Sequence, residues 1–510
     1  MNIFAQIALN AAVFLLGVFV LAPYRGHINR ISFAALSWLT GWMVCGLSSV
    51  GLVIFGLKAF LPLVSAVSLV SAVFLYKMSH KPFSALKADV VFGACVFAAG
   101  VICFAWLAQT MNFVHYSTDS LAHEGLSRVF HTYGAYEDGR SRAYYYIFNM
   151  RLPFFEAVYN IAYLSGIDVF YTFSSATGIF TLCLLVGEIL DETGKTLYTA
   201  VLSVILTVVL YISSRHVLLH SFWLLSNLMT AAYFTAGVLC LEKYISRRQN
   251  FRFFFACAFL AASCLIRKEM LIFSVLPFGF LLKKEYQPPL AAGFILYAAI
   301  AYTWFFWGIL LQLDISSLFA SGFITTSHGG NAWIFICFVL AAAVFFCGKY
   351  VIGYAGFYKT TALTLAACLL ALFALYKDDF ISTTYHLYLL MFKSRGFWDG
   401  TWYIFAATLI FAFVRNAVFN SRFSEKQEFL LYAILSFFFF RIVLYTLFTS
   451  PQDLTWGHSG NRLILHVFPL AAYWMAGVLG QFQSTEPLFE PLLNRGLKTA
   501  SKRPKKASRR

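Results

Sequence analysis

Long apolar stretches separated by short polar ones run along the whole chain. Most are roughly 17–25 residues long, about the length of helix that crosses a ~30 Å hydrocarbon layer. A backbone amide in lipid must find its hydrogen-bond partner within its own segment, so we predict that these stretches are α-helices. We therefore expect an all-α, polytopic transmembrane helix bundle with about 13–15 spanning helices. The predicted spans are 3–22, 32–56, 58–76, 89–110, 169–189, 197–213, 221–241, 253–266, 270–282, 290–311, 332–347, 351–375, 401–414, 429–448 and 463–480.

The composition excludes an ordinary soluble domain. Hydrophobic residues make up 60% of the chain and charged residues 12%, whereas roughly 25% of the residues in a soluble domain are charged. The ten cysteines lie almost all inside apolar stretches and form no C-x-x-C pair. We interpret them as small core residues, not as metal ligands or disulfides.

The net charge is +16. The positions of the basic residues indicate membrane topology and contact with membrane lipid headgroups, and do not indicate nucleic-acid binding. Basic residues gather in the connections 25–30, 77–87, 243–252, 283–284 and 415–426, and in the tail 481–510. The positive-inside rule makes this side cytoplasmic. We expect residues 1–480 to form a single transmembrane domain and residues 481–510 to form a basic cytoplasmic tail. The acidic connection 190–196 fits this assignment least well.

The opposite side carries a long first outer loop, 111–168, in which the apolar stretch 154–164 predicts a juxtamembrane helix. Shorter outer segments are 213–221, 377–400 and 449–462, and a hairpin holds Arg267-Lys268-Glu269. No internal repeat is visible in the sequence, which gives no support to the repeat symmetry of transporters.

Three segments resemble the GT-C superfamily of polytopic glycosyltransferases, especially its protein mannosyltransferase and aminoarabinose transferase branches. The first runs from Tyr116 to Glu124 and continues with Tyr133-Gly134 and Pro153-Phe-Phe-Glu156. The second is 221–282, in which short helices flank the basic outer hairpin, and the third is Gly460-Asn-Arg462 through His466 to Pro469. The sequence departs from the family where Ser120, not a second acid, follows Asp119, and where 214–227 holds no acidic residue.

The resemblance implies an inverting transferase that moves a sugar from a polyprenyl-phosphate carrier to a glycan, lipid or protein acceptor. It also implies a bacterial inner membrane, with the active site facing the periplasm. Such a reaction needs a base for the acceptor hydroxyl and positive charge for the departing phosphate. Asp119 is the candidate base, although Thr118-Asp119-Ser120 could also cap a helix. Glu124, Glu137 and Asp138 are candidates for acceptor binding, with a structural or solvated role as the alternative for each.

For the phosphate we expect Arg267, Lys268 and Arg462, with His458 beside them, because guanidinium and ammonium groups bind phosphate. Interfacial snorkelling is the alternative for the hairpin residues. Arg441 lies inside an apolar stretch and is expected to face a cavity or an internal partner, since a charge exposed to lipid is costly. His216 and His220 are four residues apart and could share a helix face. They are weak candidates for a metal site, so a divalent metal ion stays open as a cofactor.

Two other functions stay open. An O-antigen-polymerase or ligase-like enzyme would also use outer arginines and histidines on a lipid-linked glycan, but would not depend on Asp119. A transporter or flippase of lipid-linked sugars would need interrupted midplane helices at paired positions. The prolines Pro153 and Pro277 are not paired in this way.

Overall fold

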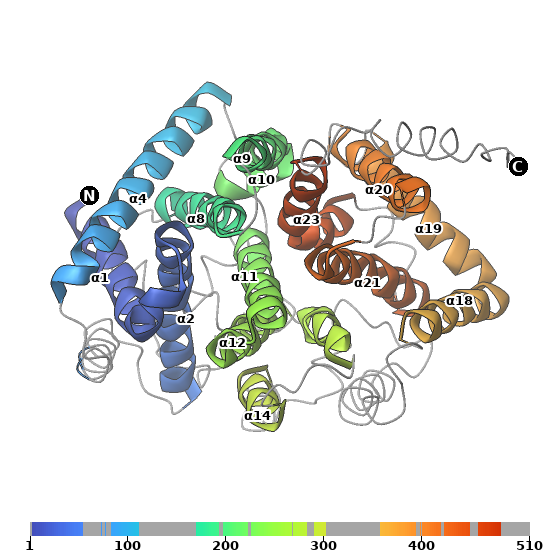
Figure 1. Ribbon diagram of the computed structural model, residues 1–510, viewed down its shortest axis with the longest axis horizontal. Coiled ribbons are helices and arrows are strands. Elements are labelled where there is room, and N and C mark those ends of the chain that lie inside the picture. Colours follow the sequence, from blue (N-terminus) through green and yellow to red (C-terminus); the bar gives the residue numbers. More distant parts are fainter. Residues whose placement is uncertain are drawn as a thin grey trace, which may run out of the picture.

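The computed structural model describes residues 3–54, 73, 77, 83–111, 170–192, 197–222, 226–267, 269–282, 290–301, 357–393, 398, 400–419, 423–448 and 457–480. These residues form fifteen α-helices and two 3-10 helices, with no strand among them, as the all-α prediction requires (Figure 1). The elements are α1 (Ile3–Leu21), η1 (Ala22–His27), α2 (Arg30–Ile54), α4 (Phe83–Met111), α8 (Phe170–Leu190), α9 (Leu197–Ser213), α10 (Arg215–Phe222), α11 (Ser226–Arg247), α12 (Asn250–Ile266), α13 (Met270–Phe273), η2 (Leu276–Leu282), α14 (Leu290–Ala301), α18 (Phe357–Leu375), α19 (Lys377–Phe392), α20 (Thr401–Phe419), α21 (Glu425–Phe448) and α23 (Gly457–Gly480).

Several of these helices can cross a membrane. Within the described ranges, five are long and apolar enough, and a sixth is obtained if α9 and α10, which meet at 67°, count as one broken span. The five windows are Leu9–His27, Arg30–Ser48, Leu86–Cys103, Glu425–Leu447 and Arg462–Gly480. Further apolar helices such as α12 and α20 are shorter. Their number indicates a multi-pass membrane protein. The predicted spans 58–76 and 332–347 lie outside the described residues, apart from single positions.

Helix α9 shows the polarity expected of a helix in lipid. Its exposed face carries Leu197, Val201, Ile205 and Val209, which recur every fourth residue and are 45–82% exposed. Its inner face carries small hydroxyl residues at the same spacing. Thr199, Ser203 and Thr207 are buried against the bundle. In water this arrangement would leave an apolar stripe uncovered. In a bilayer the lipid covers it, and small residues allow close helix contact inside.

Three differences from the predicted spans and outer segments change the order of the elements. The outer segment 377–400 begins with a regular helix, α19, whose first turn carries Asp378 and Asp379 in the position that a helix dipole favours for acids. The predicted span 270–282 is α13 followed by η2, because Pro277 has no N–H for a continuous helix. The span predicted at 221–241 begins at residue 226 and is preceded by the separate helix α10.

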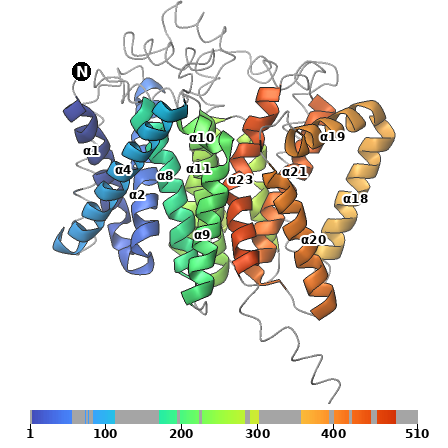
Figure 2. The ribbon, with the colours of Figure 1, turned by 90° about the horizontal axis from the view of Figure 1, so that it is seen from above.

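Helix α10 starts sharply after α9 because Ser214 caps it. The N–H of Val217 donates to Ser214 Oγ at 3.4 Å, and the N–H of Leu218 donates to Ser214 O at 3.1 Å. A serine in this place satisfies backbone donors at a helix start. The chain therefore turns between Ser213 and Arg215, and α10 lies near one end of the bundle (Figure 2).

Helix α11 occupies the centre and packs against α8, α12, α21 and α23. Every residue from Ser226 to Ile245 is buried. Helix α12 runs alongside it for 17 residues, which is about 25 Å at 1.5 Å per residue. The bundle therefore has two ends separated by roughly the thickness of a hydrocarbon layer.

Basic connections meet at one of these ends. Arg252 donates to His27 O at 3.4 Å, and Arg247 donates to Asp191 O at 2.8 Å. We name this the basic end, defined by residues 22–30, 187–192, 243–252 and 423–427. The connections 25–30, 190–196 and 243–252, which the sequence assigned to one side, thus contact one another. Which side of the membrane they face stays a prediction.

Candidate functional site

Charged and imidazole side chains from α10, the α12–α13 turn and α23 gather at the end opposite the basic end. We name them the arginine–histidine cluster, and its members are His216, His220, Arg267, Glu269, Arg462 and His466. His220 interacts electrostatically with each of the other basic members of the cluster. The cluster therefore unites four residues that the sequence singled out, the phosphate candidates Arg267 and Arg462 and the metal candidates His216 and His220.

Arg267 sits where α12 ends and is held by Glu269. The backbone at Arg267 is extended (φ −139°, ψ 120°), and its N–H donates to Ser263 O at 3.1 Å. Its Nε and Nη2 both donate to Glu269 Oε1, at 3.0 and 2.5 Å. The hairpin that separates two short apolar helices is thus closed by an ion pair between residues two positions apart.

Glu269 is ionised within this pair. Burial raises the pKa of its carboxyl, but the Arg267 guanidinium, a backbone hydrogen bond and His466 outweigh burial and hold the pKa at about 2. The side chains are mostly buried, with 18% of Arg267 and 6% of Glu269 exposed. Glu269 was not among the residues predicted to form the site. An acid between two apolar segments was the available signal.

Helix α23 contributes Arg462 and His466, which are one turn apart and share a face. His466 is completely buried, and neither ring nitrogen has a hydrogen-bond partner among the described residues. It interacts electrostatically with Arg267 and Glu269. Arg462 is partly exposed and stands nearer the end of the helix. An unpartnered imidazole next to two guanidinium groups is a place where a ligand or a proton can be received.

Aromatic rings form a wall beside the histidines. The His216 ring lies 4.4 Å from the Trp398 ring and 6.3 Å from the His220 ring, measured between centroids. Trp398 in turn packs on Phe468 of α23 at 5.1 Å. Trp398 and Phe468 are buried, and a buried aromatic wall lowers the local dielectric and strengthens the electrostatic interactions inside the cluster.

The remaining site candidates are distributed as follows. Asp119, Glu124, Glu137, Asp138 and Lys268 lie outside the described residues, and so does the outer loop 111–168 except for Met111, the last residue of α4. His458 belongs to the first turn of α23, the helix that carries Arg462.

Arg441 lies inside α21 and is 1% exposed. Its guanidinium stands 4.8 Å from the Tyr445 ring centroid, a cation–π contact. Its Nε and Nη2 have no hydrogen-bond partner within the described part of the chain. The side chain therefore points into protein and away from lipid.

A metal site is not assembled by the described side chains. Among them no group of three or more His, Cys, Asp or Glu residues could hold a metal ion. His216 and His220 thus have no described third ligand.

The net formal charge of the cluster favours an anion. The cluster contains two guanidinium groups and one carboxylate, which leaves one excess positive charge when the histidines are neutral. Guanidinium groups suit phosphate through paired N–H donors, and a neutral imidazole can accept or donate a proton. Comparison of the chain with protein-family models, with curated proteins and with solved structures finds no match.

Proposed function

We propose that the chain is a GT-C-like membrane glycosyltransferase that moves a sugar from a polyprenyl-phosphate carrier to a glycan, lipid or protein acceptor. The observation that supports this proposal best is the meeting of Arg267 and Arg462 with three histidines at one end of an apolar helix bundle. Under the positive-inside assignment this end faces the periplasm of a bacterial inner membrane. The full bundle would then contain about 13–15 spans with a long first outer loop.

The chemistry places positive charge where negative charge develops. The acceptor oxygen attacks the anomeric carbon, a new C–O bond forms, and the bond from that carbon to the phosphate oxygen breaks. The departing polyprenyl phosphate gains charge, which Arg267 and Arg462 stabilise, with Lys268 and His458 as further donors. Asp119 takes the proton of the acceptor hydroxyl. Attack from the face opposite the phosphate inverts the anomeric centre.

The test is transfer of labelled sugar from a polyprenyl-phosphate donor in membrane vesicles. Asp119→Asn and Arg462→Gln are compared with wild type and with Lys87→Gln, which removes an exposed cation on α4. We expect transfer to fall about 100-fold or more in the first two variants, by the usual size of base and charge-stabilising contributions, and to persist in Lys87→Gln. Sugar-lipid that crosses the bilayer without any product would instead indicate a transporter.

A second candidate is a ligase or polymerase acting on lipid-linked glycans, in which a histidine replaces Asp119 as base. The buried, unpartnered His466 beside Arg462 favours it. The two candidates are separated by the variants: activity that survives Asp119→Asn and disappears in His466→Gln would assign the chain to the second class.

A further inference from the structure

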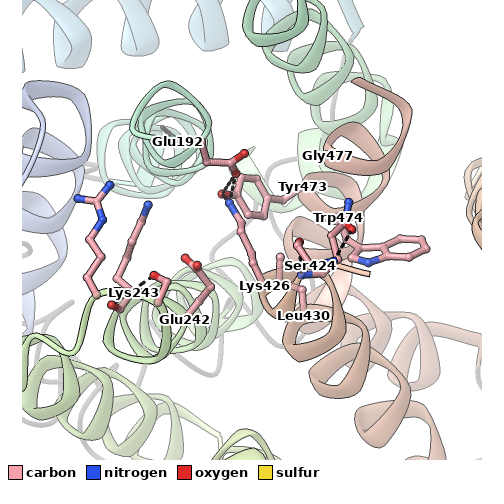
Figure 3. A pocket seen from close by; sticks show the side chains of 12 residues that line it. Glu192, Glu242, Lys243, Ser424, Lys426, Leu430, Tyr473, Trp474 and Gly477 are labelled. Carbon is pink, nitrogen blue, oxygen red and sulfur yellow. Dashed lines mark hydrogen bonds and ion pairs between the residues drawn. The ribbon is translucent and has the colours of Figure 1, made fainter. Parts of the chain in front are cut away.

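Several cations inside the bundle are held by carboxylates. At the basic end, Lys243 Nζ lies 3.0 Å from Glu188 Oε2. The Lys426 ammonium contacts the Glu192 carboxylate and the Tyr473 hydroxyl (Figure 3). Such pairing is expected in a membrane protein, because a charge without a partner is costly away from water. A buried cation that lacks a carboxylate therefore needs a separate explanation.

Arg441 of α21 is a cation of this kind. It belongs to the span Glu425–Leu447 and lies about 9 Å from the end of that segment, at 1.5 Å per residue. It is 1% exposed, and its Nε and Nη2 have no hydrogen-bond partner among the described residues. The Tyr445 ring, 4.8 Å from the guanidinium carbon, offers a cation–π contact but no negative charge. The described part of the bundle therefore leaves the positive charge of Arg441 uncompensated.

The two unused donors of Arg441 form one edge of its guanidinium plane. Nε–H and one Nη2–H point in the same direction, so this edge can hold an oxyanion with two hydrogen bonds. Arg25 uses the same edge, with Nε and Nη2 donating to Asp89 Oδ2 and Oδ1 at 2.6 and 2.9 Å. Arg267 also uses it, with both nitrogens donating to Glu269 Oε1. No described carboxylate occupies this edge of Arg441.

The packing of α21 on α13 and η2 places Arg441 beside the hairpin of the arginine–histidine cluster. The Phe273 ring of α13 stacks on the Phe437 ring of α21, with 4.2 Å between centroids, and η2 packs on α21 closer to the basic end. The two segments therefore run in opposite directions. One helical turn beyond the stacked rings, toward the end that carries the cluster, lie Arg441 on α21 and Glu269 on the other segment.

We propose that Arg441 binds a carboxylate on the transferred sugar, so that the donor is a polyprenyl-phosphate uronic acid. This proposal rests on the transferase function proposed above. In such a donor the sugar is attached directly to the phosphate, for which Arg267 and Arg462 are the proposed ligands. Arg441 lies next to the hairpin that holds Arg267, so a charged group on the sugar is the part of the substrate best placed to meet it.

The charges also balance with an acidic sugar. The phosphodiester of the donor carries one negative charge, which matches the one excess positive charge of the arginine–histidine cluster. A neutral sugar would leave Arg441 uncompensated, whereas a carboxylate supplies one negative charge and two acceptor oxygens. A phosphate monoester carries about −1.5 to −2 charges at pH 7, which a single guanidinium would not neutralise. A carboxylate therefore fits Arg441 better than a second phosphate group.

The experiment measures dissociation constants for the purified full-length protein in detergent. The probes are citronellyl phosphodiesters of glucuronic acid and of glucose, which share the phosphate and the sugar ring and differ in the carboxylate at C6. The corresponding esters of galacturonic acid and galactose form a second pair with the other orientation of the C4 hydroxyl. In at least one pair we expect the acidic ester to bind about 10-fold more tightly or better, by the usual size of a charge-assisted hydrogen bond.

Substitutions at position 441 assign this preference to the guanidinium. Arg441→Met should lower the affinity for the acidic ester to that of the neutral ester and leave the neutral ester unchanged. This variant should fold, because an apolar side chain replaces an uncompensated buried charge. Arg441→Lys keeps the charge but loses the two-donor edge, and should retain part of the preference. Lys87→Gln, which removes an exposed cation on α4, should retain all of it.

The outcomes separate this proposal from the transferase function. Equal affinity of the wild type for the acidic and neutral esters of both pairs would overturn the proposal and leave the phosphate site in place. Equal loss of affinity for both esters in Arg441→Met would overturn it as well, since Arg441 would then bind the phosphate. Failure of the wild type to bind any of the four esters would overturn the transferase function together with the proposal.

Discussion

Replacing Gly17 with alanine should force α1 and α2 apart, because the two helices touch there without intervening side chains. A Cβ built at Gly17 would lie 1.7 Å from Ser37 O and 2.6 Å from Ser37 C, and both atoms belong to the backbone. From the other side, a Cβ at Gly41 would lie 2.0 Å from Val13 O. A flexible side chain could move away from such a contact, but a backbone carbonyl moves only with its helix.

The expected cost follows from two opposing terms. Alanine is favoured over glycine inside a helix by about 1 kcal/mol. Overpacking a close contact costs about 1–3 kcal/mol, and separated helices also lose dispersion contacts along their length. We expect Gly17→Ala to lower the stability by about 1–2 kcal/mol net of the propensity gain, and Gly41→Ala to act in the same direction.

Gly477 is the matched control, since it also lies in an apolar helix but a Cβ there would meet nothing within 4 Å. Gly477→Ala should be neutral or slightly stabilising by helix propensity alone. The assay is the melting temperature of each purified full-length variant in the same detergent. If Gly17→Ala and Gly477→Ala have the same melting temperature, the close approach of α1 and α2 does not make Gly17 necessary for stability.

Three further predictions concern the buried charges. Arg267→Gln should destabilise the protein by about 3–5 kcal/mol, since it leaves the buried Glu269 carboxylate without its ion-pair partner. In a double-mutant cycle measured by thermal melting, adding Glu269→Gln should recover much of that loss. Simple additivity of the two substitutions would contradict the pairing. Because the folded pKa of Glu269, about 2, lies below its ordinary value of 4.5, its stabilisation should be full above pH 4.5 and lost as the pH falls toward 2, a dependence that Glu269→Gln should remove from melting curves. Arg441→Met should leave the melting temperature unchanged or raise it, because an apolar side chain replaces a buried charge that has no hydrogen-bond partners at Nε and Nη2 among the described residues. A clear loss of stability would show that Arg441 has partners beyond the described residues.

Much of the helix order could be predicted because lipid imposes a length on apolar segments. The predicted span 197–213 coincides with α9, and 3–22 differs from α1 by one residue at its end. Hydropathy failed where a boundary depends on a single residue. The cap at Ser214 separates α10 from α9, and Pro277 divides 270–282. Helix α19 was missed because its polar first turn and scattered tyrosines give it no long apolar run.

The site was predictable residue by residue but not as an arrangement. Arg267 and Arg462 could be predicted because a charged residue beside an apolar stretch is costly to bury and usually has a partner or a function. The fold brings both to one cluster. The ion pair between Arg267 and Glu269 was not predicted, because the segment Arg267-Lys268-Glu269 was interpreted as a basic hairpin. The ion pairs of the basic end were not predicted. The sequence presents Lys243 and Lys426 as topology signals, and only packing shows that Lys243 pairs with Glu188 and Asp191 and that Lys426 pairs with Glu192.

Helix α23 connects the arginine–histidine cluster with the basic end. Arg462 of the cluster and Tyr473, which contacts Lys426 of the basic end, are eleven residues apart, about 16 Å along the helix axis. The two ends also differ in charge balance. The described cations of the basic end are ion-paired, as in Lys243–Glu188 and Lys426–Glu192, whereas the cluster holds two guanidinium groups and one carboxylate. A phosphate group bound at the cluster is too small to reach the basic end, so variants at one end can serve as folded controls for the other.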